Sequence, residues 1–406
     1  MFIALDKDGK KVAVHYLGPN EMINFRNRSP FYCPQCQSKL IFKAGKKKIP
    51  HFAHQRLINC HAESEPESEM HLQGKKDLYV WLQTMTKTVY LEHYFTSIKQ
   101  RADIFVKKDG HSYAIEYQCS SIPLRQIIKR TEGYRQKGII PVWVLGGLPY
   151  QKQMKKTTSL YLLNEFQWSL VGIYRSRSYY LLSYKPRTKR FYCLSYLLPV
   201  TARKTFGQLH SIPLSKATFP LTVSKETKKS RYSLTDWINE KRQWLNQKVY
   251  FTKNRSDPFL KAIYESKLTT YLLPPIIGVP INQNNCKTNV IEWQFYVWHD
   301  FLSKLKKGDT FTDHDLFQKM AIRVEKRHIQ FRTLLLNHET NQSCDQLFLA
   351  YLNVLVKTGY ILKYGCSNYQ LVKKLSFSQN VEAAYQEERN FYKQYARYLF
   401  IYPTSN

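Results

Sequence analysis

The stretch RADIFVKKDGHSYAIEYQ, residues 101–118, decides the fold that the sequence predicts. Two runs rich in apolar residues, Arg101–Lys107 and Ser112–Cys119, flank the turn sequence Lys108-Asp109-Gly110. Asp-Gly between two such runs is a strong signal for a β-hairpin, because both residues tolerate the positive φ angles of a tight turn. We therefore expect two antiparallel strands joined at Gly110.

The flanking segments extend this hairpin to an α/β core. A helical pattern running to about Thr86 and a strand pattern at Tyr90–Phe95 come before it, and a helical segment at Pro123–Lys137 comes after it. The next run, Ile139–Leu145, is apolar on both faces, which is typical of a buried parallel strand. The order helix, three strands, helix, strand predicts an α/β core with a mixed sheet.

The hairpin carries two carboxylates and an amide that indicate chemistry. Asp103 lies within an apolar strand, where an unpaired carboxylate would be costly to bury. Glu116 and Gln118 share one face of the next strand, because side chains alternate along a strand. If the hairpin brings Asp103 and Glu116 together, they offer two oxygen ligands to Mg²⁺ or Mn²⁺, an ion that can polarise a phosphodiester and activate water. The alternative for Asp103 alone is a turn or cap carboxylate.

Three residues on the preceding helix are spaced four apart. Glu67, His71 and Lys75 therefore line one helix face, which would look onto the same metal. The competing interpretation is a helix cap at Glu67 followed by a solvated ladder of side chains, and for this triplet alone it is the more common arrangement.

The N-terminal segment has the spacing of a zinc site. Cys33 and Cys36 form a Cys-x-x-Cys turn, which presents two thiolates to one tetrahedral ion. The second pair must come from His51, His54 and Cys60. If His51 to His54 is extended, the two rings point to opposite faces, so we expect His54 with Cys60 and keep His51 as the alternate. Four protein ligands would make this Zn²⁺ site structural, and unrelated thiols near histidines are the alternative.

Composition and charge limit the class of protein. With 43% hydrophobic and 15% aromatic residues, the 406-residue chain is expected to fold into two or three domains. The 62 Lys and Arg against 30 Asp and Glu give a formal charge of +32, which favours a polyanionic partner over a membrane surface. Asp6 and Asp8 interrupt the start before any apolar run, so no signal peptide is predicted and a cytoplasmic location is expected.

These residues, in this order, resemble the competence protein CoiA family. The motifs that carry the resemblance are Phe31-Tyr32-Cys33-x-x-Cys36, His51-Phe52-Ala53-His54, Glu67-Ser68-x-x-His71-x-x-x-Lys75, Asp103 and Ile115-Glu116-Tyr117-Gln118. The resemblance implies a zinc-ribbon-like N-terminus, a central domain similar to PD-(D/E)XK nucleases and a family-specific C-terminal region.

The resemblance also implies roles for single residues. Glu67 matches the helix acid of the nuclease fold, Asp103 its metal-binding aspartate and Glu116 its second metal-binding acid. Gln118 stands where most members of that wider fold carry lysine, and an amide cannot supply the positive charge that assists cleavage. Lys75 or Arg130 would have to supply it from a helix.

The expected organisation is an α/β nuclease-like core with a mixed sheet, between a small zinc-binding β module and a mainly α-helical C-terminal region. The expected extents are residues 1–62 for the zinc-ribbon-like module, 63–155 for the nuclease-like domain, 156–233 for an aromatic and basic connecting region, and 234–406 for the helical region. In the last region, a helix at Gln346–Thr358 followed by a hairpin leaves two interpretations open, a plain helical packing domain and a winged-helix-like module.

The predicted function is competence-associated DNA processing by a metal-dependent nuclease. Its expected partners are DNA, single-stranded or in recombination intermediates, and recombination proteins. The main alternative is a non-catalytic DNA-binding protein that keeps the nuclease fold as a scaffold, and Gln118 favours it. A third hypothesis is an RNA-binding zinc protein, since phosphate contacts do not separate RNA from DNA.

Overall fold

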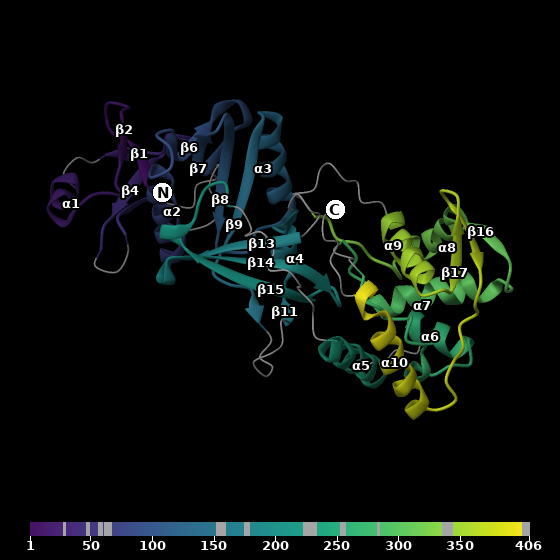
Figure 1. The fold of residues 1–406 in the computed structure, drawn as a ribbon. Helices are drawn as coiled ribbons and strands as arrows, with labels where there is room; N and C mark the ends of the chain where they lie inside the picture. The colour runs from purple at the N-terminus through teal and green to yellow at the C-terminus, as the bar shows by residue number, and fades with distance from the viewer. Residues whose placement is uncertain are drawn as a thin grey trace.

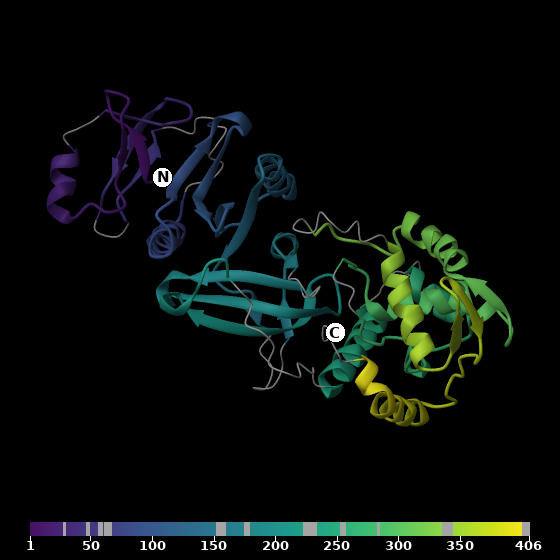
Figure 2. The ribbon, with the colours of Figure 1, turned by 45° about the horizontal axis from the view of Figure 1, so that its top comes forward.

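The computed structural model of the chain contains three parts that follow one another along the sequence (Figure 1). It describes residues 1–26, 30–45, 49–55, 60, 67–151, 160–173, 179–221, 234–251, 257–281, 285–334 and 344–399. A small β module lies at one end, a large sheet with its helices lies in the middle, and a mainly helical part lies at the other end; Figure 2 shows the same order after rotation. This is the predicted fold class.

The N-terminal part is an antiparallel sheet with strand order β2-β1-β3-β4-β5. Its elements are β1 (Ile3–Leu5), β2 (Lys11–Ala13), α1 (Pro19–Arg26), β3 (Phe31–Tyr32), β4 (Lys39–Lys43) and β5 (His51–His54). Aromatic rings fill its small core: Phe25 and Phe31 are stacked with ring centroids 4.9 Å apart, and Phe52 lies 5.0 Å from Phe31. A module with so small an apolar core is of the kind that a bound metal ion commonly stabilises.

The central part is a mixed sheet with strand order β10-β11-β15-β14-β13-β9-β8-β7-β6, in which β12 also pairs with β13. Strand β9 runs parallel to both β8 and β13, and the other pairings are antiparallel. Its elements are α2 (Glu69–Gln83), β6 (Val89–Phe95), β7 (Gln100–Lys108), β8 (His111–Gln118), α3 (Leu124–Gln136), β9 (Ile139–Gly146), β10 (Tyr150–Gln151), β11 (Leu160–Leu162), α4 (Glu165–Ser169), β12 (Gly172–Ile173), β13 (Tyr179–Lys185), β14 (Arg190–Pro199) and β15 (Lys204–Pro213).

The hairpin that the sequence predicts is β7–β8. Lys108 pairs with His111 at its end, and Asp109 and Gly110 have φ angles of 50° and 77°. Positive φ at both turn residues is the requirement of a type I′ hairpin turn, which explains why Asp-Gly stands there.

The aromatic and basic stretch after residue 155 corrects one expectation. We expected a connecting region over residues 156–233, but the residues described there form β11 to β15 and continue the central sheet. The side chains of β13 alternate between the two faces of the sheet, and both faces are covered. Leu181 and Tyr184 are buried in different cores, and only Lys185 at the strand end is partly exposed, so the aromatic and basic residues did not show the apolar–polar alternation of a typical strand. Tyrosine and basic residues are thus compatible with a strand whose faces are both partly covered.

Helices α2 and α3 cover opposite faces of the sheet. Leu72 and Leu78 of α2 pack with Ile104 and Ile115 in one core, which also takes in the apolar residues of the N-terminal module. On the other face, Tyr134 of α3 packs with a second set of strand residues, Ala102, Phe105 and Ala114. Neighbouring residues of β7 and β8 therefore meet different helices.

The C-terminal part is mainly helical. Its elements are α5 (Leu234–Phe251), α6 (Pro258–Glu265), α7 (Val290–Asp300), β16 (Thr310–Thr312), α8 (Asp313–Glu325), α9 (Cys344–Lys357), β17 (Ile361–Tyr364), β18 (Asn368–Leu371) and α10 (Val381–Leu399). The three short strands form a sheet with order β16-β18-β17. Helix α9 and the β17–β18 hairpin lie where the sequence predicts a helix followed by a hairpin. Across the described part of the chain, no helix joins sufficient length to sufficient apolar character to cross a bilayer.

Candidate active site and candidate metal centre

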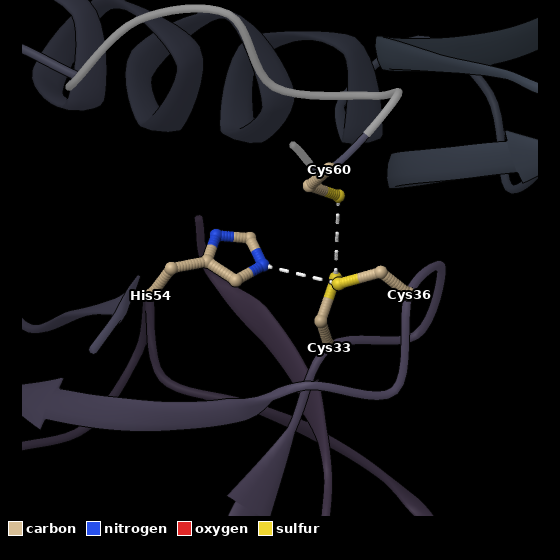
Figure 3. Close-up of side chains that lie close together, drawn as sticks. All are labelled: Cys33, Cys36, His54 and Cys60. Atoms are coloured by element: carbon tan, nitrogen blue, oxygen red, sulfur yellow. Dashed lines mark hydrogen bonds between the residues drawn. The ribbon is translucent and has the colours of Figure 1, made fainter. Parts of the chain in front are cut away.

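Three thiols and one imidazole converge at the edge of the N-terminal sheet (Figure 3). Cys33 and Cys36 lie on the turn after β3, His54 ends β5, and Cys60 comes from the segment that leads to α2. The Sγ atoms of Cys33 and Cys60 are 4.0 Å apart, and Cys36 Sγ lies 3.4 Å from His54 Nε2. A tetrahedral Zn²⁺ with bonds of about 2.3 Å to sulfur separates its ligand atoms by roughly 3.8 Å, so the donor set and its spacing fit zinc.

The turn after β3 creates this geometry. The backbone N–H of Gln37 donates to Cys33 O at 2.9 Å, and Gln37 has a φ angle of 56°, which closes the turn and presents both thiols on one side. Burial raises the pKa of Cys33 to about 12. Burial also opposes ionisation of Cys36, but hydrogen bonds with Ser38 and His54 outweigh it and lower the pKa of Cys36 to about 6.

His51, the alternate ligand, does not belong to this group of four. It begins β5, and its Nδ1 lies 2.8 Å from the carbonyl oxygen of Ile49. Burial lowers the pKa of its imidazole, which keeps the ring neutral. The group of four that the structure brings together is Cys33, Cys36, His54 and Cys60.

A second cluster lies where the N-terminus of α2 crosses β7. Carboxylate oxygens of Glu67 and Asp103 and a ring nitrogen of His71 all lie within 4.8 Å of one another. The hydroxyl of Ser68 caps the helix by accepting from the His71 N–H at 3.2 Å, so Glu67 lies just before the helix with its carboxylate turned to the sheet. Asp103 Oδ2 lies 3.5 Å from His71 Nε2 and accepts from the Tyr117 N–H at 2.9 Å. Glu67 and Asp103 are thus gathered from segments 36 positions apart.

Lys75 stands at the centre of this cluster. Its ammonium donates to Glu67 and, at 2.6 Å, to Glu92 Oε1, and it lies 3.7 Å from Asp103 Oδ1. The Lys75 side chain is 0% exposed, and the three carboxylate side chains are 9%, 1% and 14% exposed in the same order. Lys75 therefore places a positive charge next to Asp103. The sequence analysis had named Lys75 and Arg130 as the two possible sources of such a charge.

The charges of this cluster hold each other ionised. Burial opposes ionisation of Glu67, Glu92 and Asp103, but the charge of Lys75 outweighs it and lowers the pKa of each. The same carboxylates outweigh burial at Lys75 and raise the pKa of its ammonium. The α-amino group of Met1, 2.6 Å from Glu67 Oε2, and the charge of Arg101 also lower carboxylate pKa values here, so groups of the protein itself offset most of the negative charge.

Glu116 contacts a different helix. Both of its oxygens lie 2.5 Å from Arg130 Nη2 on α3, and it also accepts from the Tyr134 hydroxyl. Burial, with a smaller contribution from the charge of Asp103, raises the pKa of Glu116 against the effect of Arg130. Asp103 and Glu116 are therefore close enough for the charge of Asp103 to raise the pKa of Glu116. Asp103 nevertheless contacts residues of α2, and Glu116 contacts residues of α3.

Gln118 is turned to the following loop. Its amide nitrogen donates to the carbonyl oxygen of Ser120 at 3.0 Å and to the Ser120 hydroxyl at 3.2 Å. Arg130 also donates to the carbonyl oxygen of Arg101, at 2.8 Å, so its guanidinium links α3 to β7 as well as to Glu116. The two cations considered for the site thus have separate tasks, Lys75 beside Asp103 and Arg130 beside Glu116.

Sequence comparison identifies the protein family of this chain. The nuclease-like domain of competence protein CoiA matches residues 67–227, the N-terminal domain residues 17–63 and the C-terminal domain residues 233–385. The chain belongs to the competence protein CoiA family. The competence protein CoiA of Bacillus subtilis (strain 168) is 30% identical to it over 350 residues, which are 86% of this chain and 91% of that relative. No solved structure gives a significant match.

The CoiA nuclease-like domain includes the strands that we expected to be a connecting region. Its match begins at Glu67 and ends beyond β15, so the acidic cluster lies at the start of the domain and the sheet extension belongs to it. The two carboxylates and one imidazole of this cluster lie close enough together to hold one divalent metal ion.

Glu92 is the residue of this CoiA site that sequence reasoning missed. Its carboxylate accepts from the backbone N–H groups of Phe2, at 2.9 and 2.8 Å, and Ile3, at 3.1 Å, and so joins β1 to the cluster. It also has a φ angle of 50°, an uncommon value for a residue in a strand. The signal that revealed Asp103, an acid within an apolar strand, was equally present in the segment Val89–Phe95.

Proposed function

We propose that this CoiA protein is a metal-dependent deoxyribonuclease that processes incoming or recombining DNA in the cytoplasm during natural transformation. The observation that carries the proposal is the cluster of Glu67, His71 and Asp103 with Lys75 in the nuclease-like domain. The charge of +32 supports a polyanionic substrate, single-stranded DNA or a recombination intermediate, and leaves recombination proteins as further proposed partners.

The proposed roles follow from the contacts. Asp103 and Glu67 would hold Mg²⁺ or Mn²⁺, with His71 positioned by its contact with Asp103. A bound divalent ion would polarise the phosphodiester and lower the pKa of an attacking water. Lys75, which is fully buried, would act through the positive charge that it holds 3.7 Å from Asp103 Oδ1, a charge that Gln118 cannot supply. Glu116, the second acid of the predicted pair, could bind the metal only if its ion pair with Arg130 opened. We therefore propose that Glu116 has a structural role and links β8 to Arg130 of α3.

The N-terminal cluster has a separate proposed role. Cys33, Cys36, His54 and Cys60 would bind one structural Zn²⁺, because four protein ligands close the coordination shell and leave no position for a substrate. The ion would replace a larger apolar core in the module.

Cleavage of labelled single-stranded, duplex and branched DNA in Mg²⁺ or Mn²⁺ tests the nuclease proposal. Asp103→Asn should reduce the rate on the order of 100-fold or more, because it removes a charged metal ligand while keeping the side-chain shape. The matched control is Asp109→Asn at the tip of the β7–β8 hairpin, where the side chain is 71% exposed and pairs with Lys108. Equal cleavage by the wild-type protein and Asp103→Asn would remove the proposal.

The second candidate is a non-catalytic DNA-handling protein built on the nuclease fold. Gln118 favours it, and so does Lys75, whose ammonium already partly neutralises the carboxylates. The same assay separates the two candidates, since this alternative expects DNA binding without product in either metal. Glu116→Gln adds one distinction: a loss as large as that of Asp103→Asn would make Glu116 a metal ligand, against our assignment.

A further inference from the structure

Helix α6 in the C-terminal part separates two hollows of the surface. On one side, a cleft of about 530 Å³ is lined by lysines of α6, of α8 and of the segments that follow α7 and α8, among them Lys261, Lys304, Lys319 and Lys326. On the other side, a groove of about 500 Å³ is lined by Tyr264 and Tyr271. Lys261 and Tyr264 are three residues apart on α6, so the cleft and the groove meet at this helix.

The cleft has an excess of positive charge. Two of its cations are paired, Arg323 with Asp300 at 2.6 and 2.8 Å and Lys261 with Glu265 at 3.8 Å. The other three, Lys304, Lys319 and Lys326, are exposed and form no ion pair with any residue that the structure describes. Three unpaired lysines around one hollow attract a polyanion, and their charges are free to replace its counterions.

The groove has an excess of exposed aromatic surface. Tyr264 is 62% exposed and Tyr271 is 39% exposed, and Tyr250 and Phe251, which follow Val249 of the groove wall, are 82% and 70% exposed. Two exposed tyrosines thus line one hollow, and two more exposed rings follow Val249 outside that lining; such a grouping indicates a binding surface, whereas singly scattered exposed rings are common. Unpaired bases stack on such rings whatever their sequence.

We infer that the cleft and groove on either side of α6 form a second nucleic-acid-binding site, for single-stranded nucleic acid, with phosphates on the lysines and bases on the tyrosines. Duplex DNA fits the observations less well, because its bases are already stacked and cannot reach the rings. The recognition helix of a winged-helix module would be α9, but Lys357 is its only basic residue, which directs the contact to α6 and α8 instead. The choice of DNA over RNA rests on the proposed function.

The new site is remote from the acidic cluster. Helices α6 and α8 lie in the green C-terminal part, at the end of the molecule opposite to α2 and the N-terminal sheet (Figures 1 and 2). A strand held at α6 would therefore be retained independently of any chemistry at Asp103, so binding and cleavage can be measured separately.

The charge arm of the test uses the full chain without added Mg²⁺ and a fluorescent oligothymidylate followed by anisotropy. Replacing Lys304, Lys319 and Lys326 together by Gln should weaken binding and reduce the slope of log affinity against log salt by about 2, since each phosphate contact with a single strand releases roughly 0.7 counterion. The matched control replaces Lys7, Lys10 and Lys11, three exposed lysines of the N-terminal module, by Gln and should leave the slope nearly unchanged.

The aromatic arm uses Tyr264→Ala with Tyr271→Ala. Affinity for the oligothymidylate should fall roughly tenfold or more, and Tyr264→Phe with Tyr271→Phe should restore it because the rings still stack. Circular dichroism and the unfolding temperature of each variant confirm that the fold is intact. Since binding is measured without the divalent metal, a failure of cleavage with Asp103→Asn leaves this result unaffected.

Three outcomes would overturn the inference. The first is wild-type affinity and salt slope in the triple lysine variant. The second is tighter binding of a matched duplex than of the single strand, which would indicate a winged-helix contact. The third is a wild-type protein that forms a dimer and a Tyr264→Ala, Tyr271→Ala variant that is monomeric, which would make the groove a contact between two copies of the chain.

Discussion

Lys75 is the residue on which the charge balance of the candidate active site depends. It is fully buried, and its ammonium is shared by Glu67, Glu92 and Asp103. A buried ion pair contributes little net stability by itself, but removal of one partner leaves the other charges buried without compensation. A helix position four residues after His71 therefore decides whether three carboxylates can remain ionised in the folded protein.

Lys75→Met should lower the free energy of unfolding by about 3–5 kcal/mol near neutral pH. In the wild-type protein the pKa values of Glu67, Glu92 and Asp103 are lowered, so their contribution is present above the unfolded pKa and is lost as pH falls through the folded pKa. Without Lys75 their pKa values rise, and protonation of the carboxylates on acidification removes the uncompensated charges from the variant. The gap between the two proteins should therefore narrow on acidification.

Urea unfolding at two pH values measures this gap. Lys76→Met, on the neighbouring position of α2, is the control and should change stability by no more than about 0.5 kcal/mol. A gap that stays constant between neutral and acidic pH would contradict the assignment of the Lys75 charge to these carboxylates.

Helix α2 can position the cluster because it packs against β8 with no side chain between them at Gly74. Gly74 faces the ring of Tyr117 on β8, and a Cβ atom at that position would overlap the ring. The ring cannot easily move aside, because Tyr117 is fully buried and its hydroxyl donates to the carbonyl oxygen of Tyr184 at 3.2 Å. The missing side chain at Gly74 thus sets the distance between Lys75 on the helix and Asp103 on β7.

Gly74→Ala tests this packing. In an exposed helix the change stabilises by about 1 kcal/mol, but here the clash with Tyr117 should destabilise the protein by about 1–3 kcal/mol. The displaced helix should also lower the cleavage rate. Thermal unfolding and the DNA cleavage assay are the measurements, and Val80→Ala, at a 49% exposed position of the same helix, should be neutral or slightly stabilising. A more stable Gly74→Ala protein would show that the space between α2 and Tyr117 accommodates a methyl group, against this account.

At the scale of the molecule, the N-terminal module and the nuclease-like domain are one packed unit. Phe2, Phe31, Phe52 and Cys33 belong to the same core as Leu72 and Ile104. The contact is also polar, since the α-amino group of Met1 lies 2.6 Å from Glu67 Oε2 and the N–H groups of Phe2 and Ile3 donate to Glu92. A metal that orders the module therefore supports two acids of the candidate active site.

Removal of zinc should loosen the N-terminal sheet and the neighbouring strand β6 of the central sheet, and leave the far strands of the central sheet intact. The Cys33→Ser, Cys36→Ser double variant should lose about one zinc per chain in metal analysis of freshly purified protein. Hydrogen exchange should then speed up at amides of β1 and β6 while amides of β14 and β15, whose residues also pack against the C-terminal part, keep their protection. Absence of zinc from the wild-type protein, or uniform loss of protection, would contradict this account.

The sequence by itself determined the local elements and the groups of ligands that are close along the chain. Asp109-Gly110 specified the β7–β8 turn, and Cys33-x-x-Cys36 placed two thiols on one turn, because such features depend on a few consecutive residues. The acid within the apolar strand at Asp103 was also visible, since a buried charge must have a partner somewhere.

Only the tertiary structure decided which partner each acid has. Alternation assigns a side chain to a face of a strand, but it does not say that α2 covers the face of Asp103 and α3 the face of Glu116. The sequence shows Glu92 as an acid within an apolar strand, but only the structure shows that it contacts Lys75 and the N–H groups of Phe2 and Ile3. The strands after residue 155 join the sheet through pairings with segments far along the chain. Contacts of this kind depend on how the helices and strands pack, and packing is a property of the whole molecule.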